Sequence, residues 1–127
     1  MKKEKLYTEK LPTFPVFSQG IKVGNFVFTS AFLALKAEDG KLIQGTFEEE
    51  TVKAMENLKA CVESAGLTMA DVIKTTVYLT DLKDFPTFNQ VYCRYFSDPM
   101  PARGCVEVSG LVAGGRVEIE AIAFKAE

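Results

Sequence analysis

The sequence predicts an α+β domain in which two helices cover one face of a mixed β-sheet. Alternating, β-rich segments occur near both ends and in the middle, and two segments with helical periodicity lie between them. The 127 residues are 47% hydrophobic and 25% charged, an ordinary globular balance, so we expect one domain spanning residues 1–127. Two helices cannot cover both faces of such a sheet. The second face is therefore expected to meet water or another subunit.

Two short strands are expected first, at residues 17–22 and 26–30. Gly24 and Asn25 between them predict a tight turn, because both residue types tolerate a positive φ. The preceding residues 2–5 mix lysine with glutamate, and we expect them to form a solvated terminus.

A helix is expected over residues 46–65, where apolar side chains recur at steps of three and four residues. Thr46 followed by Glu49 resembles a capping box. Gly66 is a natural residue to end this helix, because glycine readily adopts the left-handed conformation found there.

The second half of the sequence predicts a strand, a helix and two further strands. Residues 71–80 alternate, and we expect one face to carry Ile73, Thr75, Val77 and Leu79 and the other Lys74, Thr76, Tyr78 and Thr80. The helix is expected over residues 85–96, with Asp84 as its cap. Residues 102–109 and 116–124 are expected to be strands separated by a glycine-bearing turn.

Charge and composition argue against several classes of protein. The net charge is −2 and the basic residues form no stripe, so a nucleic-acid partner is not expected. No apolar run approaches the ~18 residues of a membrane span, and the N-terminus lacks the apolar core of a signal peptide. The three cysteines form no Cys-x-x-Cys pair, which favours a reduced, cytoplasmic setting.

The sequence contains no histidine. This excludes Ser-His and Cys-His nucleophile pairs and the common histidine-containing zinc sites. Acid–base chemistry therefore has to come from carboxylates, lysine, tyrosine, cysteine or bound water.

Arg103 is the strongest candidate for binding a ligand, because it places a charge in an otherwise apolar strand. Burying an unpaired charge is costly, and the guanidinium fork binds a carboxylate in bidentate fashion. The structural alternative is an ion pair with Glu107 or another acid of the same sheet.

Glu118 and Glu120 share one face of the last strand, and a carboxylate in a closed site can hold and polarise water. The alternative is that both are paired with basic groups or amides at an interface. We expect Arg103, Cys105 and Glu107 on the same uncovered face. In a simple hairpin Arg103 would lie far from Glu118, so a curved sheet or a neighbouring subunit would have to bring them together.

Cys105 is a possible nucleophile, since Arg103 could lower the pKa of its thiol. No residue here accepts its proton as a histidine would, so the role of a small buried hydrophobe is favoured. Core positions are also expected for Cys61 and Cys93.

Two C-terminal segments are specific enough to indicate a family. They are Pro101-Ala102-Arg103 with Cys105-Val106-Glu107-Val108, and Val117-Glu118-Ile119-Glu120-Ala121-Ile122-Ala123. Nearer the N-terminus, Phe17-Ser18-Gln19-Gly20 and Val27-Phe28-Thr29-Ser30 support them. Together these segments resemble the RidA (YjgF) family of small trimeric imine deaminases, over nearly the whole chain.

The resemblance implies a chorismate-mutase-like α+β fold, a homotrimer with clefts between subunits, and neither cofactor nor metal. It implies hydrolysis of 2-imino acids, of the 2-iminobutanoate and 2-iminopropanoate type, to 2-oxo acids and ammonia. Arg103 would hold the substrate carboxylate and Glu118 would position the water. The other substrate-binding positions that it implies are Phe17, Ser30, Ala31, Asn89 and Cys105. Without the resemblance, Ser30 and Asn89 are typical capping or surface residues.

Departures from the family pattern gather near the expected cleft. Phe17 stands where tyrosine is usual, Ala31-Phe32 where Gly-Gln is usual, and Gly104 where serine is usual. They leave the arginine and the glutamate in place but leave substrate size open. Two alternatives to the deaminase are a non-catalytic regulatory trimer that binds small carboxylates and a translation-inhibiting ribonuclease. The negative net charge and the lack of histidine argue against the ribonuclease.

Overall fold

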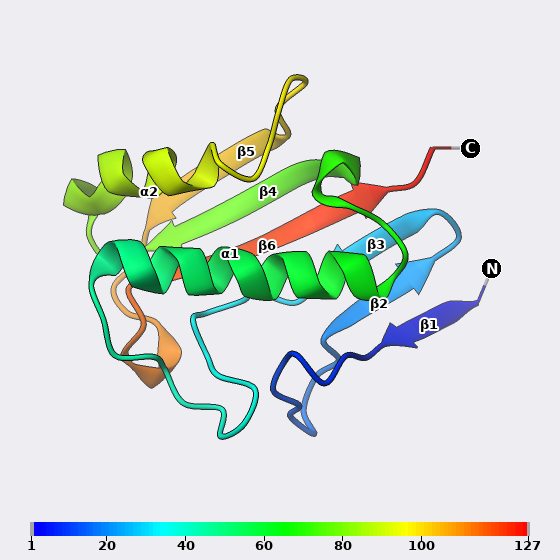
Figure 1. The fold of residues 1–127 in the computed structure, drawn as a ribbon, viewed down its shortest axis with the longest axis horizontal. Helices are drawn as coiled ribbons and strands as arrows, with labels where there is room; N and C mark the ends of the chain where they lie inside the picture. Colours follow the sequence, from blue (N-terminus) through cyan, green and yellow to red (C-terminus); the bar gives the residue numbers. More distant parts are fainter. Residues whose placement is uncertain (1, 127) are drawn as a thin grey trace.

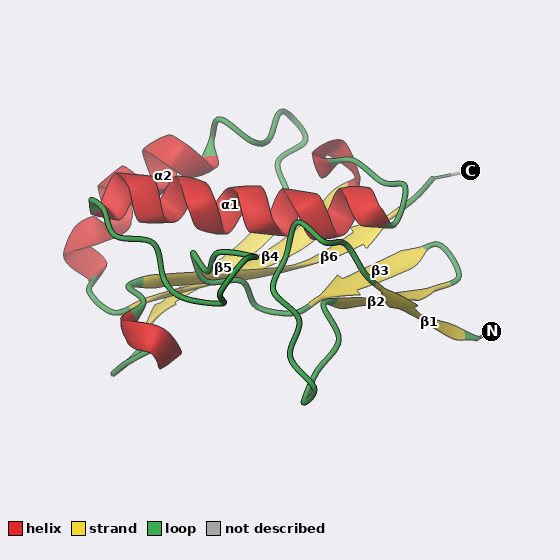
Figure 2. Ribbon diagram, turned by 60° about the horizontal axis from the view of Figure 1, so that its bottom comes forward, coloured by secondary structure: helices red, strands yellow, loops and turns green. Residues whose placement is uncertain are grey.

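The computed structural model describes residues 2–126, which form a six-stranded sheet and two α-helices. The strands are β1 (Lys3–Leu6), β2 (Gly20–Val23), β3 (Phe26–Thr29), β4 (Val72–Leu79), β5 (Ala102–Glu107) and β6 (Val117–Phe124), and the helices are α1 (Phe47–Ser64) and α2 (Phe85–Tyr92). Single turns of 3-10 helix occur at Met69–Asp71, Leu82–Asp84 and Val112–Gly114. Both α-helices lie on one side of the sheet (Figure 1, Figure 2), which confirms the predicted layering.

The C-terminal strand lies inside the sheet, whose strand order is β1-β2-β3-β6-β4-β5. Strand β6 runs antiparallel to both of its neighbours, β3 and β4. At the edge, β5 runs parallel to β4, and α2 provides the crossover that parallel neighbours need. The last two strands therefore do not form a hairpin, because β4 lies between them.

Helix α1 begins and ends as the sequence predicts. The Glu49 backbone N–H donates to the Thr46 hydroxyl at 3.1 Å, and the Glu49 carboxylate accepts from the Thr46 N–H at 2.8 Å. This reciprocal pair is the predicted capping box. Just past the helix, Gly66 has a φ of +82° and donates its N–H to the Glu63 carbonyl, a conformation that favours glycine.

The core lies between the helices and the inner strands. Strand β6 alternates strictly: its odd-numbered residues are buried towards α1, and its even-numbered residues are half-buried on the uncovered face. Leu58, Phe88 and Ile119 are fully buried, and each such side chain contributes roughly 1.5–3 kcal/mol through burial. The alternation places Glu118 on the face that no helix covers.

An ion pair between the buried Glu50 and the partly exposed Arg116 links the start of β6 to the first turn of α1. Glu50 is 2% exposed and accepts from the Arg116 backbone N–H at 2.6 Å and from Arg116 Nε at 2.7 Å. Arg116 also donates to the Gly45 carbonyl at 2.9 Å. These bonds fix the C-terminal end of the loop that precedes β6.

The structure adds one strand to the predicted sheet and corrects one predicted face. Residues 3–6 form β1 and pair with β2; Lys3, Glu4 and Lys5 are exposed, as predicted for the terminus, and Leu6 is buried. The predicted face containing Ile73 is wrong at that residue. A β-bulge between Val72 and Lys74 buries Val72 and leaves Ile73 47% exposed.

Two further corrections concern α2. The helix ends at Tyr92, earlier than predicted, and Asp84 makes no capping hydrogen bond through its side chain. Cys93 lies just past that end and is exposed, whereas Cys61 is buried on α1 as predicted. Within residues 2–126, no helix has both the length and the hydropathy needed to cross a membrane.

Candidate functional site

Arg103 lies on the edge strand β5 beneath α2, among aromatic side chains. Its guanidinium carbon is 4.9 Å from the ring centre of Tyr92, 5.4 Å from that of Phe85 and 5.8 Å from that of Phe88. Its Nη1 donates to Asn89 Oδ1 at 2.8 Å. The rings attract the cation and the amide fixes its orientation. Helix α2 therefore prearranges the guanidinium.

No carboxylate within residues 2–126 pairs with Arg103. Glu107, the acid considered from sequence, instead accepts a hydrogen bond from the Leu82 backbone N–H at 2.8 Å. The ion pairs among these residues involve other cations. A half-buried, oriented guanidinium without a counter-ion is well suited to bind an external carboxylate.

Cys105 follows two residues later on β5 and packs against the core. Burial raises the pKa of its thiol above the ordinary value of 9.0, while Arg103 acts in the opposite direction and has the smaller effect. The thiol is therefore protonated at neutral pH, which does not suit a nucleophile. We call Arg103, Asn89 and Cys105 the Arg103 cluster.

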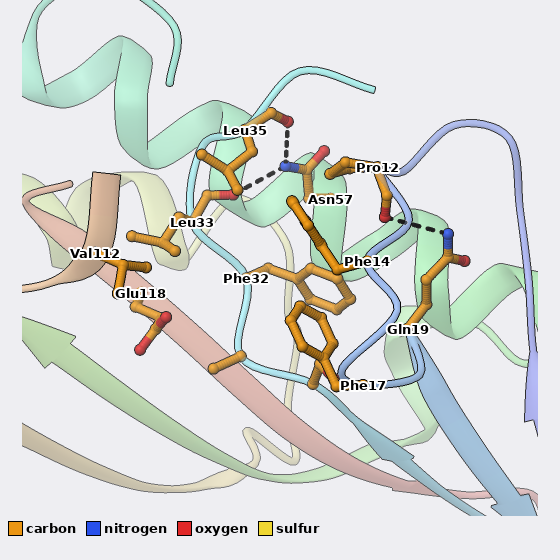
Figure 3. Close-up of a pocket in the computed structure, with 12 residues that line it drawn as sticks. Pro12, Phe14, Phe17, Gln19, Phe32, Leu33, Leu35, Asn57, Val112 and Glu118 are labelled. Atoms are coloured by element: carbon orange, nitrogen blue, oxygen red, sulfur yellow. Dashed lines mark hydrogen bonds between the residues drawn. The ribbon is translucent and has the colours of Figure 1, made fainter. Parts of the chain in front are cut away.

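A second group of residues lines a cavity of about 380 Å³ beside β6, where Phe32 pairs with Ile119 (Figure 3). Its size falls in the usual range for small-molecule sites. The lining residues are Pro12, Phe14, Phe17, Gln19, Ser30, Ala31, Phe32, Leu33, Leu35, Asn57, Val112 and Glu118. We call this cavity the Glu118 pocket. It brings together four predicted site residues, Phe17, Ser30, Ala31 and Glu118.

The carboxyl group of Glu118 lies in surroundings that favour its neutral form. Burial is the larger cause and the neighbouring Glu120 is the smaller one, and both raise the pKa of Glu118 above its ordinary value of 4.5. Glu120 accepts a hydrogen bond from the Tyr78 hydroxyl, which raises the pKa of Tyr78 to about 12. A carboxylate with a raised pKa is a stronger proton acceptor.

The Arg103 cluster and Glu118 lie on opposite faces of the sheet. Arg103 pairs with Thr75 of β4, and the buried Thr75 hydroxyl is 2.7 Å from the Tyr92 hydroxyl of α2. Glu118 pairs with Tyr78, which has the opposite parity on β4. Paired residues of adjacent strands point to the same face. The prediction that Arg103 shares the uncovered face with Glu118 is therefore wrong.

The same correction applies to Cys105 and Glu107, which share the parity of Arg103. They pair with Val77 and Leu79, both fully buried towards the helices. The error arose because the face of β5 depends on its parallel pairing with β4, which the alternation of β5 itself does not reveal.

Sequence analysis missed Phe14, Gln19 and Val112 as lining residues of the pocket. All three lie outside the strands and α-helices, where no periodicity indicates which way a side chain points. Within residues 2–126, no three His, Cys, Asp or Glu side chains form a group suited to a metal ion.

Comparison with known proteins identifies the family. Residues 8–125 match the family model described as Endoribonuclease L-PSP. The chain is 46% identical over 127 residues to a RutC family protein of Pyrococcus abyssi, covering 98% of this chain and 99% of the relative. The chain belongs to the RidA (YjgF) family.

Two other RidA-family relatives bear on the chemistry. A Mus musculus protein named 2-iminobutanoate/2-iminopropanoate deaminase is 40% identical over 109 residues, covering 86% of this chain and 81% of the relative. The crystal structure of E. coli TdcF with bound serine superposes with a TM-score of 0.90 at 34% identity, covering 97% of this chain and 99% of that one. The predicted family and α+β fold are confirmed.

The departures from the RidA family pattern fall in the places just described. Phe17, Ala31 and Phe32 all line the Glu118 pocket, and Gly104 directly follows Arg103. A Cβ atom added at Gly104 would meet nothing within 4 Å among residues 2–126. Packing within this part of the chain therefore does not require glycine there.

Proposed function

We propose that this chain hydrolyses reactive 2-imino acids to 2-oxo acids and ammonia, at a site shared between the subunits of a homotrimer. The observation that supports this most is the unpaired guanidinium of Arg103, held in orientation by Asn89 and three aromatic rings. It meets the first requirement of the reaction, which is capture of the substrate carboxylate.

The second requirement is a water molecule placed to attack the C=N carbon, and Glu118 meets it. Water adds to the C=N carbon, a C–O bond forms, and the water gives up a proton while the imine nitrogen gains one. The hydroxyl of the resulting carbinolamine then gives up its proton and the amine nitrogen gains one. The C=O bond of the 2-oxo acid forms as the C–N bond breaks, and ammonia leaves. Glu118, with its raised pKa, orients the water and accepts its proton. The reaction is not a redox step and needs no covalent nucleophile, which agrees with the protonated thiol of Cys105.

A second subunit is needed because Arg103 and Glu118 point to opposite faces of one sheet. The uncovered face also exposes aromatic side chains: Phe26 is 42% and Phe28 is 44% exposed, and the Phe26 ring centre is 4.8 Å from that of Phe124. Contiguous apolar surface of this kind marks protein interfaces. In a head-to-tail ring, the β5 edge of one subunit meets the Glu118 pocket of the next.

The relatives support the same substrate class. The mouse protein is named for 2-iminobutanoate and 2-iminopropanoate, and the TdcF crystals contain serine, an amino acid with a free carboxylate. Carrying these properties to this chain is part of the proposal.

The test is an assay of 2-oxo acid formation from an imine generated in situ by an amino-acid oxidase or a dehydratase. We expect a rate well above that of spontaneous hydrolysis, and light scattering should give a mass three times the chain's 14.0 kDa. A mass of one or two chains at micromolar concentration would contradict the shared site.

The same assay separates the alternatives. Tight binding of a small carboxylate without hydrolysis would favour a non-catalytic binding trimer over the enzyme. The family description includes an endoribonuclease, and salt-dependent binding and cleavage of RNA by the purified chain would favour that activity instead.

A further inference from the structure

We propose that the Glu118 pocket selects 2-imino acids with bulky apolar side chains, aromatic ones above all, over those with a methyl or ethyl side chain. The inference rests on the proposed function and extends it from a reaction class to a preferred substrate.

The pocket has an aromatic wall opposite the carboxylate. The rings of Phe14 and Phe17 are 5.4 Å apart and tilted by 34°, and Phe32 is 8% exposed. Figure 3 shows these three rings on one side and the Glu118 carboxylate on the other. Aromatic pairs prefer such offset or tilted arrangements at 4.5–7 Å, so a substrate ring can join the existing pair.

The polar lining residues other than Glu118 are engaged with the protein itself. Gln19, Ser30 and Asn57 all donate hydrogen bonds to backbone carbonyls of the surrounding loops. The wall facing Glu118 therefore presents apolar groups to a bound molecule. A hydrophobic lining with few placed polar groups is typical of sites for apolar ligands.

The wall is also fixed in place, so it does not collapse around a small ligand. Gln19 is 4% exposed and bonds to both the N–H and the carbonyl of Thr8, which anchors the segment leading to Phe14. Phe32 exchanges backbone hydrogen bonds of 2.7 and 3.1 Å with Ile119. Val112 belongs to the loop whose end is fixed by the ion pair between Arg116 and the buried Glu50.

Volume then decides between small and large side chains. In the single chain the cavity is about 380 Å³, and a methyl or ethyl group held near Glu118 leaves its aromatic wall without contacts. Unfilled space forfeits dispersion contacts with the lining, and a single methylene in a hydrophobic pocket changes kcat/KM by roughly 10–200-fold. A phenyl group beside Phe14 and Phe17 recovers these contacts.

The experiment compares two imines, formed in situ by one amino-acid oxidase from phenylalanine and from alanine. For each we measure kcat/KM for hydrolysis and, separately, the affinity for the unreactive analogues 3-phenylpropanoate and propanoate. We expect kcat/KM to favour the aromatic imine by at least about tenfold, and the aromatic carboxylate to bind more tightly.

Phe17→Ala is the matched test variant, and Val16→Ala is its control. Phe17 lines the pocket and is half-exposed, so its truncation spares the core; Val16 is 85% exposed and lies outside the lining. We expect Phe17→Ala to lower kcat/KM for the aromatic imine by about tenfold while changing the alanine-derived imine far less. Val16→Ala should leave the ratio unchanged.

The outcomes separate this inference from the proposed function. If both imines are hydrolysed with equal kcat/KM, or the small one with the higher kcat/KM, the inference is overturned and the proposed deaminase activity stands. If neither imine is hydrolysed but 3-phenylpropanoate binds more tightly than propanoate, and Phe17→Ala abolishes this preference, the proposed deaminase activity is wrong and the apolar pocket is supported. If the protein neither hydrolyses the imines nor binds the carboxylates, both the proposed deaminase activity and the inference are wrong.

Discussion

The Arg103 cluster and the Glu118 pocket handle a charged side chain in opposite ways. Around Arg103, aromatic rings and an amide oxygen contact the guanidinium and orient it at the edge of the sheet. Around Glu118, burial and a second carboxylate destabilise the charged form. The first arrangement suits permanent anion binding, and the second suits a group that gains and loses a proton. Under the proposed function, these two groups on opposite faces are the two halves of one site, which we call the half-sites.

The largest effect is expected for Arg103→Ala, which removes the anion-binding half. Losing one partner of a buried charge-assisted pair costs roughly 2–5 kcal/mol, so turnover should be abolished. Arg103→Lys should rescue poorly, because lysine lacks the bidentate fork. Steady-state imine hydrolysis measures both, and circular dichroism checks that the fold is kept. Activity of Arg103→Ala within a fewfold of wild type would remove Arg103 from the mechanism.

Glu118→Gln removes the carboxylate charge from the Glu118 pocket and keeps the shape of the side chain. We expect kcat to fall by roughly 10²–10⁴-fold, the usual range for general acid–base catalysis, with a smaller change in substrate affinity. The readout is the split between kcat and KM for one imine. A rise in KM at unchanged kcat would make Glu118 a binding residue only.

Mixing these two inactive variants tests directly whether the half-sites combine across subunits. Subunits carrying Arg103→Ala and Glu118→Gln, coexpressed in equal amounts, should regain activity at about a quarter of the sites in a randomly mixed symmetric ring. Each restored site pairs the intact arginine of one subunit with the intact glutamate of the other. Mixed trimers without activity would mean that both groups act within one chain or that the site is elsewhere.

A pH profile sharpens the comparison further. The ionised form of Glu118 accepts the proton, so kcat/KM should fall as the pH drops through its pKa, above the ordinary 4.5. Glu120→Gln removes one of the two causes that raise this pKa, and the acid limb should therefore move to lower pH. Burial, the larger cause, stays. An acid limb that stays in place or moves to higher pH would exclude Glu120 as an influence on Glu118.

The smallest effect is expected for Cys105→Ser, although the residue lies in the Arg103 cluster. Its thiol has a raised pKa and is protonated at neutral pH, so most of the activity should remain under the same assay conditions. An inactive Cys105→Ser beside an active Glu118→Gln would point to covalent catalysis.

Local patterns predicted those parts of the structure that local interactions determine. The capping box at Thr46, the apolar stripe of α1 and the alternation of β6 follow from short-range spacing. The face of Arg103 could not be predicted, because it depends on which strand β5 pairs with and in which direction. The bulge at Ile73 and the pairing of β1 are long-range features for the same reason.

In the candidate site, too, the sequence identified individual residues but not the long-range contacts around them. The residue types at Arg103 and Glu118 were identified from charges in apolar strands, and Asn89 and Phe17 from the family resemblance. The contacts that define their chemistry come from elsewhere in the chain. The rings of Phe85, Phe88 and Tyr92 orient Arg103, while Gln19 anchors the segment that carries Phe14. Neither contact leaves a periodic signal in the sequence.

The position of β6 inside the sheet has a consequence for folding. Strand β6 joins β3 to β4 by backbone pairing, and it also carries Glu118. Without β6, no strand pairing among residues 2–126 links the N-terminal strands to the β4–β5 pair. The pairing of β6 with β3 joins residues far apart in the sequence, and such non-local pairing is intrinsically slow. The pocket and the surface proposed for assembly are therefore completed only when this slow pairing has formed, so the chain has to fold before it can assemble.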